Sequence, residues 1–242
     1  MTSTVTLGRV ADIAQEQWGL VTRRQADLAG VPRTTLERLT APGSALERVA
    51  HGVYRLMGAP IPDHQELRAA WLQLSPEVAA WERVPDQGVV SHRSAASLYG
   101  LGHLPADRHE FTFPRRRQTR HSDVRVHIRP VAEGEWTMLS GLPVTRPARI
   151  ASDLLSGHED PGAVAHVVAD AIRGAFDEPR SFVGARAPHA ARMGLHRADG
   201  LGLFAWLLGL VGDPDTARWL DEAQAVLVDP AVPANARQAP AR

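Results

Sequence analysis

The spacing of apolar residues changes along the first sixty positions of the chain. Up to residue 18, apolar side chains recur every three or four residues, which predicts one buried face of a helix over 7–18. The residues with this spacing are Val10, Ile13, Ala14 and Trp18. Between 46 and 56, apolar and polar residues alternate in the manner of two strands, and His51-Gly52 is expected to form the tight turn of a hairpin.

Two further short helices are predicted between these segments. Thr22 and Gln25 have the spacing of a capping box, in which each side chain bonds the other residue's backbone amide. The second helix therefore begins at Thr22, and Gly30 is expected to end it. A third helix is expected to begin near Pro32, whose fixed φ suits a first helical turn, and to end near 41–43.

Three short helices followed by a hairpin are the element order of a winged helix-turn-helix domain. We assign it to residues 1–58, because the Pro/Gly cluster at 58–62 breaks both helix and strand. Residues 63–228 are predicted to form a larger mixed domain with a small sheet and a helical C-terminal part, which makes the fold class mixed α/β (α+β). Its first helix is expected over 63–83. The segment 229–242 has too few apolar residues to pack and is expected to be disordered.

Charge is balanced in total but unevenly distributed. Arginine supplies all 27 basic residues, and Asp and Glu together number 27, so the formal net charge is zero. Residues 1–60 carry seven Arg against five acids, residues 106–130 seven against three, and residues 131–242 ten against fourteen. Only local basic patches can therefore favour nucleic acid as a partner.

The composition excludes several kinds of active site. Without cysteine or lysine, the chain has no thiolate nucleophile, cysteine-ligated zinc, Walker lysine or Schiff-base lysine. Ser91 and His92 are adjacent at a predicted strand, so their side chains are expected on opposite faces, unable to pair. No metal motif is present, and we expect no catalytic residue, no metal and no cofactor. A nuclease with a DNA-targeting arm is the disfavoured alternative.

No apolar run approaches the ~18 residues of a membrane span. The first ten residues also lack the basic start and apolar core of a signal peptide. We therefore expect a cytoplasmic protein with no membrane partner.

Two groups of residues resemble one family. The first group lies in the predicted winged helix: QWGLVTRRQA at 17–26, Gly30-Val31, Arg48-Val49 and GVYR at 52–55. The second lies in the larger domain: SH and SAA within 91–96, Gly100-Leu101, GLPVT at 141–145, Arg149 and Asp153. In order and spacing they resemble AbiEi-type antitoxins over about residues 8–210. Pro32 departs from the pattern, because Ser or Thr often caps the third helix of a helix-turn-helix.

The resemblance implies a function in two parts. Proteins of this family are the antitoxin half of an operon whose toxin is a nucleotidyltransferase. Their N-terminal domain binds inverted repeats of double-stranded DNA in the operon's own promoter and represses it. Because residues 1–60 carry a net charge of only +2, we expect the DNA-bound form to depend on a homodimer. Their C-terminal domain counters the toxin. The alternative is a stand-alone winged-helix regulator whose second domain senses a ligand or a protein.

The third helix and the hairpin supply the candidate DNA contacts. Base edges are usually touched by the start of a recognition helix, and Arg suits guanine, so the base-reading set is Arg33, Thr34, Thr35 and Arg38. The set expected to contact mostly phosphate is Thr22, Arg23, Arg24, Arg48, His51 and Arg55. A protein-docking module is the alternative for both sets.

A second basic stretch lies between the strands predicted at 109–113 and 124–128. It contains Arg115, Arg116, Arg117 and Arg120. These residues are expected to be either a contact with nucleic acid or the toxin, or a solvated hairpin loop.

Overall fold

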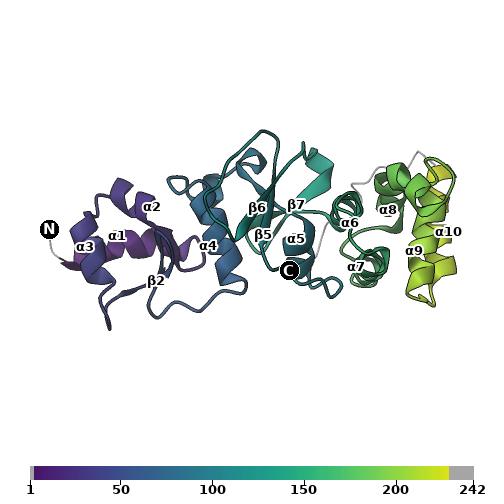
Figure 1. The fold of residues 1–242 in the computed structure, drawn as a ribbon. Helices are drawn as coiled ribbons and strands as arrows, with labels where there is room; N and C mark the ends of the chain where they lie inside the picture. Colours follow the sequence, from purple (N-terminus) through teal and green to yellow (C-terminus); the bar gives the residue numbers. More distant parts are fainter. Residues whose placement is uncertain (1–2, 229–242) are drawn as a thin grey trace. The chain divides into compact units, whose positions relative to one another are not determined.

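The structure, a computed structural model, describes residues 3–228 and divides into two compact units (Figure 1). The first unit comprises the chain up to Leu98 together with Pro105–Thr145. The second comprises Tyr99–Leu104 together with the chain from Arg146 onward. The predicted boundary at 58–63 falls inside the first unit. The segment 229–242, expected to be disordered, lies outside the described residues.

The first unit begins with a winged helix, as the element order predicts. Its helices are α1 (Ser3–Gln15), α2 (Arg23–Leu28) and α3 (Arg33–Leu39). Its antiparallel sheet, in the order β1-β3-β2, contains β1 (Leu20–Thr22), β2 (Leu46–Ala50) and β3 (Val53–Leu56). One apolar cluster forms its core: Val10, Ala14, Val21, Ala26, Val31, Leu36, Leu39 and Leu46.

Helix α1 ends at Gln15, three residues before its predicted end. Trp18 and Gly19 take positive φ values of 62° and 77° and reverse the chain. The reversal allows Leu20–Thr22 to pair with β3 as a strand that the sequence did not predict. This short strand fixes the position at which α2 begins.

The starts of α2 and α3 differ. At α2, the predicted capping box is present: Thr22 Oγ1 accepts from the Gln25 amide at 3.1 Å, and Gln25 Oε1 accepts from the Thr22 amide at 2.9 Å. At α3, Pro32 occupies the cap position and offers no side-chain hydrogen bond. The first turn of α3 is therefore held by backbone bonds alone, with the amides of Thr35 and Leu36 donating to the Pro32 carbonyl.

The second part of the first unit is a five-stranded mixed sheet in the order β6-β5-β4-β8-β7. Its strands are β4 (Val89–Val90), β5 (His109–Phe113), β6 (Val124–Ile128), β7 (Trp136–Leu139) and β8 (Leu142–Thr145). Helix α5 (His92–Tyr99) follows β4, and a 3-10 turn (Glu133–Glu135) precedes β7. Because β5 and β6 are parallel, residues 114–123 form a crossover from the end of β5 to the start of β6. This pairing excludes the hairpin that was one of the two alternatives for this loop, because a hairpin joins antiparallel strands.

Helix α4 (Gln65–Leu74) is shorter than the helix predicted over 63–83. Pro76 cannot donate a helical hydrogen bond, and two 3-10 turns (Ala80–Glu82 and Pro85–Gln87) replace the rest of the expected helix. The Arg83 guanidinium caps the end of α4 by donating to three of its last carbonyls, those of Trp71, Leu72 and Ser75. Burial lowers the pKa of Arg83 to about 9.

Buried glutamines join the winged helix to the segment after α4. Gln17 Nε2 donates to Gln25 Oε1 at 2.6 Å. Gln25 Nε2 in turn donates to the Val78 carbonyl at 3.1 Å, and Gln17 Oε1 accepts from the Ala80 amide at 3.2 Å. These hydrogen bonds give the buried Gln17 and Gln25 side chains polar partners and hold the winged helix against residues 76–80.

A second contact within the same unit is made by Trp18. Its Nε1 donates to the Ser140 carbonyl at 3.0 Å, and Arg68 Nη1 donates to the same oxygen at 2.8 Å. The Arg68 guanidinium lies 4.4 Å from the centroid of the Trp18 ring, which also meets Trp71 edge to face. The winged helix and the mixed sheet are therefore packed as one unit.

The second unit is built from helices. They are α6 (Pro147–Ser156), α7 (Pro161–Arg173), α8 (Pro179–Arg186), α9 (Gly200–Leu210) and α10 (Thr216–Val228). Helix α8 is followed by a 3-10 segment (Ala187–Met193), since Pro188 removes a helical donor. In its core, Phe182 stacks on Phe204 with the ring centroids 6.0 Å apart.

Candidate nucleic-acid interface

The outer face of α3 carries most of the predicted base-reading set. Arg33, Thr34 and Arg38 are exposed and Thr35 is partly buried, while Leu36 and Leu39 on the opposite face are in the core. Arg33 Nε lies 2.7 Å from Glu37 Oε1, one helical turn away, and this hydrogen bond raises the pKa of Arg33. Because both side chains remain more than half exposed, the ion pair is weak and leaves Arg33 available to another acceptor.

The wing, defined as the β2–β3 hairpin with its turn at His51-Gly52, carries two exposed basic side chains. Arg48 Nη2 lies 3.1 Å from His51 Nδ1, and Arg48 Nε donates to the Ala50 carbonyl at 3.4 Å. A register shift between Arg48 and Ala50 marks a bulge at this point of β2. The bulge and these contacts position Arg48 over the turn.

One surface hollow collects basic residues from all three parts of the motif. We name it the α3–wing hollow. It brings together Arg23 from α2, Arg33 from α3, and Arg48 and His51 from the wing. Tyr54, a residue that sequence reasoning missed, also lines it and packs against the core cluster of the winged helix. Thr34, Thr35 and Arg38 do not line this hollow.

A neighbouring hollow shares Arg23, His51 and Gly52 with the first. We name it the α2–loop hollow, because its remaining lining comes from α2, the end of α4 and the 114–123 loop: Arg24, Asp27, Gln73, Pro76 and His121. Gln73 Nε2 donates to the His51 carbonyl at 2.8 Å and so ties α4 to the wing. Neither Gln73 nor His121 was singled out from the sequence, since only the fold places them beside the winged helix.

Thr22 was predicted to contact phosphate, and the structure corrects this. Its side chain is 0% exposed. The hydroxyl accepts from the Gln25 amide and donates to the Pro76 carbonyl. Thr22 therefore has a structural role, with no surface left for DNA.

Arg55 was also predicted to contact phosphate, and the structure corrects this too. Its side chain is 11% exposed on the central strand β3. Its guanidinium donates to Glu47 Oε2 across the hairpin and to the Ala59 carbonyl. The charge of Arg55 is thus paired with Glu47 within the fold.

The 114–123 loop displays the second basic stretch. Arg115, Arg116, Arg117 and Arg120 are all exposed. Arg117 lies over the Phe113 ring, with its guanidinium carbon 5.2 Å from the ring centroid. These four arginines do not line the two hollows, but His121 at the end of the same loop does.

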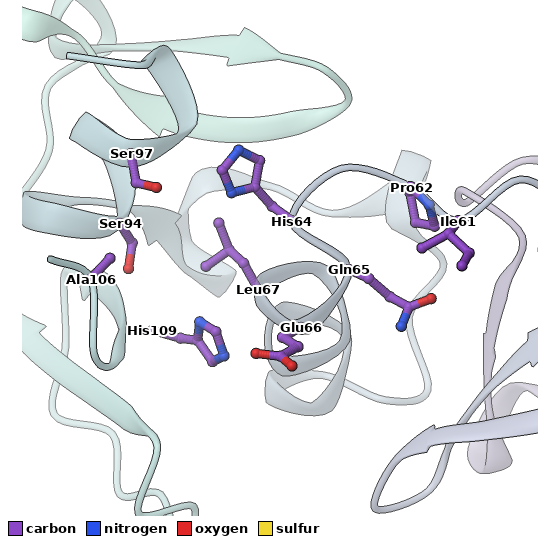
Figure 2. A pocket seen from close by; sticks show the side chains of 10 residues that line it. All are labelled: Ile61, Pro62, His64, Gln65, Glu66, Leu67, Ser94, Ser97, Ala106 and His109. Atoms are coloured by element: carbon purple, nitrogen blue, oxygen red, sulfur yellow. The ribbon is translucent and has the colours of Figure 1, made fainter.

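A polar hollow lies at the start of α4, and its lining differs in chemistry from these basic surfaces. Figure 2 shows the His109 ring and the Glu66 carboxylate pointing toward one another, with Ser94 and Ser97 across from them. Burial lowers the pKa of His109, while Asp123 and Glu66 oppose the shift. Burial therefore favours the neutral form of the His109 imidazole.

Ser91 and His92 correct a further expectation, because they do pair. The strand ends at Val90 and His92 takes a positive φ of 52°, so His92 Nδ1 lies 3.0 Å from Ser91 Oγ. Ser91 also accepts from Thr112 at 2.8 Å. Since Ser91 is 0% exposed, no substrate can reach its hydroxyl, and the pair is part of a buried polar network.

The same network contains Glu110 and His127. His127 Nε2 lies 3.1 Å from Glu110 Oε1, and the His127 ring stacks on His92 with a centroid distance of 3.5 Å. Burial alone would raise the pKa of Glu110, but hydrogen bonds from His127 and the Arg93 amide lower it below its usual value. Across the described residues, no three His, Asp or Glu side chains converge as a metal site requires.

None of the helices between residues 3 and 228 has the length and apolar character needed to cross a membrane. The helices, the strand order and the exposed α3 face define a winged helix-turn-helix, a class that typically places its third helix in the DNA major groove. Residues 9–56 match the family model described as "Transcriptional regulator, AbiEi antitoxin". This match confirms the resemblance over that segment and supports an AbiEi-type antitoxin, a family of transcriptional regulators. No curated protein matches the chain.

Proposed function

We propose that the winged helix binds double-stranded DNA, with α3 in the major groove and the wing against the backbone. The observation that carries the proposal is the α3–wing hollow, where Arg23, Arg33, Arg48 and His51 meet within the segment that matches the regulator family. A phosphate backbone passing over this surface meets positive charge from three elements at once.

Within this interface we divide the roles by position. Arg33, Thr34, Thr35 and Arg38 read base edges from α3. Arg23, Arg24, Arg48 and His51 contact phosphates and set the register. Thr22 and Arg55 are not part of the interface, because their side chains are buried and bonded within the fold.

We further propose that the DNA is the promoter of the protein's own operon. The protein would act in the cytoplasm as an autorepressor and as the antitoxin of a nucleotidyltransferase toxin, without catalytic activity of its own. On inverted repeats, two copies would bind half-sites about 34–36 Å apart, one turn of DNA. The family match supports the regulator and antitoxin parts of this proposal.

The first test measures binding of the purified protein to DNA from just upstream of its gene, against a shuffled competitor. For Arg33→Ala we expect a loss of preference for the promoter of about 5- to 140-fold, since one good bidentate base contact contributes about 1–3 kcal/mol. For Arg48→Ala we expect weaker binding to both DNAs and a salt slope smaller by about 0.9. Equal binding of promoter and shuffled DNA by the unsubstituted protein would refute promoter recognition.

The antitoxin part is tested in cells arrested by the nucleotidyltransferase encoded beside this gene. Expression of the full chain is expected to restore growth, and Arg33→Ala is expected to restore it equally, because toxin neutralisation is assigned to the second part of the chain. Failure of the full chain to restore growth would reject the antitoxin role and leave the DNA-binding role standing.

The polar hollow of Figure 2 favours a second candidate, a stand-alone regulator that senses a small ligand. It places the Glu66 carboxylate and the His109 imidazole opposite one another. A small ligand that carries both a hydrogen-bond donor and an acceptor would bond to these two side chains. This candidate predicts specific DNA binding with no rescue from the toxin, so the growth assay separates the two.

A further inference from the structure

We propose that the 114–123 loop is a second DNA-contacting element, which binds phosphates next to those held by the winged helix. The inference rests on the proposed DNA-binding function and extends its interface into the mixed sheet. It assigns Arg115, Arg116 and Arg120 to phosphate contacts, with Arg117 and His121 holding the loop in place.

The first support is charge that the fold does not neutralise. None of Arg115, Arg116, Arg117 and Arg120 forms an ion pair with a carboxylate of the described chain. Exposed arginines elsewhere often have such a partner one helical turn away, as Arg33 has Glu37 and Arg218 has Glu222. Four unneutralised cations within six residues repel one another, and a polyanion relieves that repulsion.

The second support is the position of the loop. His121 lines the α2–loop hollow together with Arg23, Arg24 and His51, which the proposed function already assigns to phosphate. The end of the 114–123 loop therefore shares one hollow with basic residues of α2 and the wing, among which Arg23 also pairs with Asp27. A DNA backbone that leaves the winged helix on this side reaches the loop next.

The third support is that the loop is held in place before any ligand binds. At its start, Arg117 packs on the Phe113 ring. At its end, the His121 amide donates to Thr119 Oγ1 at 3.1 Å, and the Asp123 carbonyl accepts from the His109 amide at 2.7 Å. A pre-ordered loop loses less conformational entropy on binding than a free one.

The composition of the loop favours DNA over a protein partner. Protein–protein hot spots are enriched in arginine, but they are equally enriched in buried aromatic anchors such as Trp and Tyr. Residues 114–123, PRRRQTRHSD, contain none. Arginine, glutamine, threonine and serine are instead the side chains that commonly bond phosphate oxygens.

The experiment compares two charge-matched double variants of the full chain. Arg115→Ala with Arg116→Ala removes two loop cations, and Arg197→Ala with Arg218→Ala removes two exposed cations from the second unit. Affinity for the promoter fragment is measured at several salt concentrations. Thermal unfolding of each variant checks that the fold is intact.

For the loop variant we expect the slope of log affinity against log salt to fall by about 1.8, since each lost phosphate contact removes about 0.9. Between 0.05 and 0.2 M salt, this makes the decline in affinity roughly 12-fold smaller than for the unsubstituted protein. Preference for promoter over shuffled DNA should stay unchanged, because phosphate contacts carry no sequence information. Replacing both residues by Lys should restore most of the slope, and the control variant should keep it.

Two results would overturn the inference while leaving the proposed function intact. One is an unchanged salt slope in the loop variant, alongside normal loss of preference in Arg33→Ala. The other is unchanged DNA binding with lost rescue of toxin-arrested cells, which would make the loop a toxin contact. If the unsubstituted protein does not bind promoter DNA at all, the proposed function and this inference fail together.

Discussion

Helices α2 and α3 are neighbours built from the same kinds of residue, yet the structure buries two polar side chains at the start of α2 and exposes those at the start of α3. Thr22 and Gln25 at the start of α2 turn inward and are 0% and 4% exposed. Arg33 and Thr34 at the start of α3 turn outward into solvent. The sequence alone made both helix starts candidates for DNA.

The difference comes from what packs against each helix. The segment after α4 lies against the start of α2, and its carbonyls at Pro76 and Val78 accept from Thr22 and Gln25. Within residues 3–228, no such segment bonds to the side chains of Arg33 and Thr34 at the start of α3, and Arg33 bonds instead to Glu37 of the same helix. Polar residues at a helix-turn-helix therefore indicate DNA contact only where the rest of the chain leaves them uncovered.

The largest effect is expected when the buried Gln25 side chain is removed. In Gln25→Ala, the Thr22 amide, the Val78 carbonyl and Gln17 each lose a buried partner. Unpaired buried groups cost about 1–3 kcal/mol each, so we expect the free energy of unfolding to fall by about 3 kcal/mol. Urea unfolding followed by far-ultraviolet circular dichroism measures it.

The control for that measurement is Gln15→Ala, at an exposed position of α1. Its effect should stay within about 0.5 kcal/mol. If Gln25→Ala costs no more than this control, the buried network does not hold the winged helix to the sheet.

The same Thr→Val substitution at the start of each helix separates a structural role from a DNA-binding role. Thr22→Val removes the cap of α2 and its bond to the Pro76 carbonyl, so we expect a loss of stability of about 1–2 kcal/mol with the salt slope of DNA binding unchanged. Thr34→Val should leave stability unchanged and alter only the preference among DNA sequences. Urea unfolding and the promoter competition assay, applied to both variants, decide the assignment. A change in salt slope for Thr22→Val would return that residue to the interface.

The smallest effect on stability is expected for two histidines, the partly buried His109 and the exposed His51. Burial lowers the pKa of His109 below its usual 6.5, so the unfolded chain binds this proton more readily than the folded chain. The stability that neutral His109 contributes is therefore present above pH 6.5 and is lost as the pH falls through the folded-state pKa.

In His109→Gln we expect a weaker decline of the unfolding free energy between about pH 7.5 and 5.5. Urea unfolding at three pH values across this range measures the decline. His51→Gln, at an exposed wing residue, should keep the full decline. Equal declines in both variants would show that His109 does not contribute to the pH dependence.

Local signals in the sequence predicted much of the winged helix. The Thr22–Gln25 capping box, the stop at Gly30 and the start near Pro32 depend on residues close in the chain, and the structure confirms them. The exposure of Arg33 could likewise be predicted, since Leu36 and Leu39 fix which face of α3 is buried.

Features that depend on distant residues could not be predicted in this way. Strand β1 exists because Leu20–Thr22 pairs with β3. The charge of Arg55 is balanced by an ion pair with Glu47, which lies opposite it on β2. His121 joins the basic surface only through the parallel pairing of β5 and β6. The Ser91–His92 pair depends on a positive φ that no local pattern announces.

The hydrogen bond between Trp18 and Ser140 also has a consequence for how the chain is made. These partners are 122 positions apart, and Arg68 donates to the same carbonyl. At about 5–20 residues per second, a ribosome needs roughly 6–24 s to add the residues between them. During that interval the Trp18 indole lacks its acceptor, and the Arg68 guanidinium, 72 positions before Ser140, lacks it for the later part. The winged helix therefore completes this contact only after β7 has been synthesised.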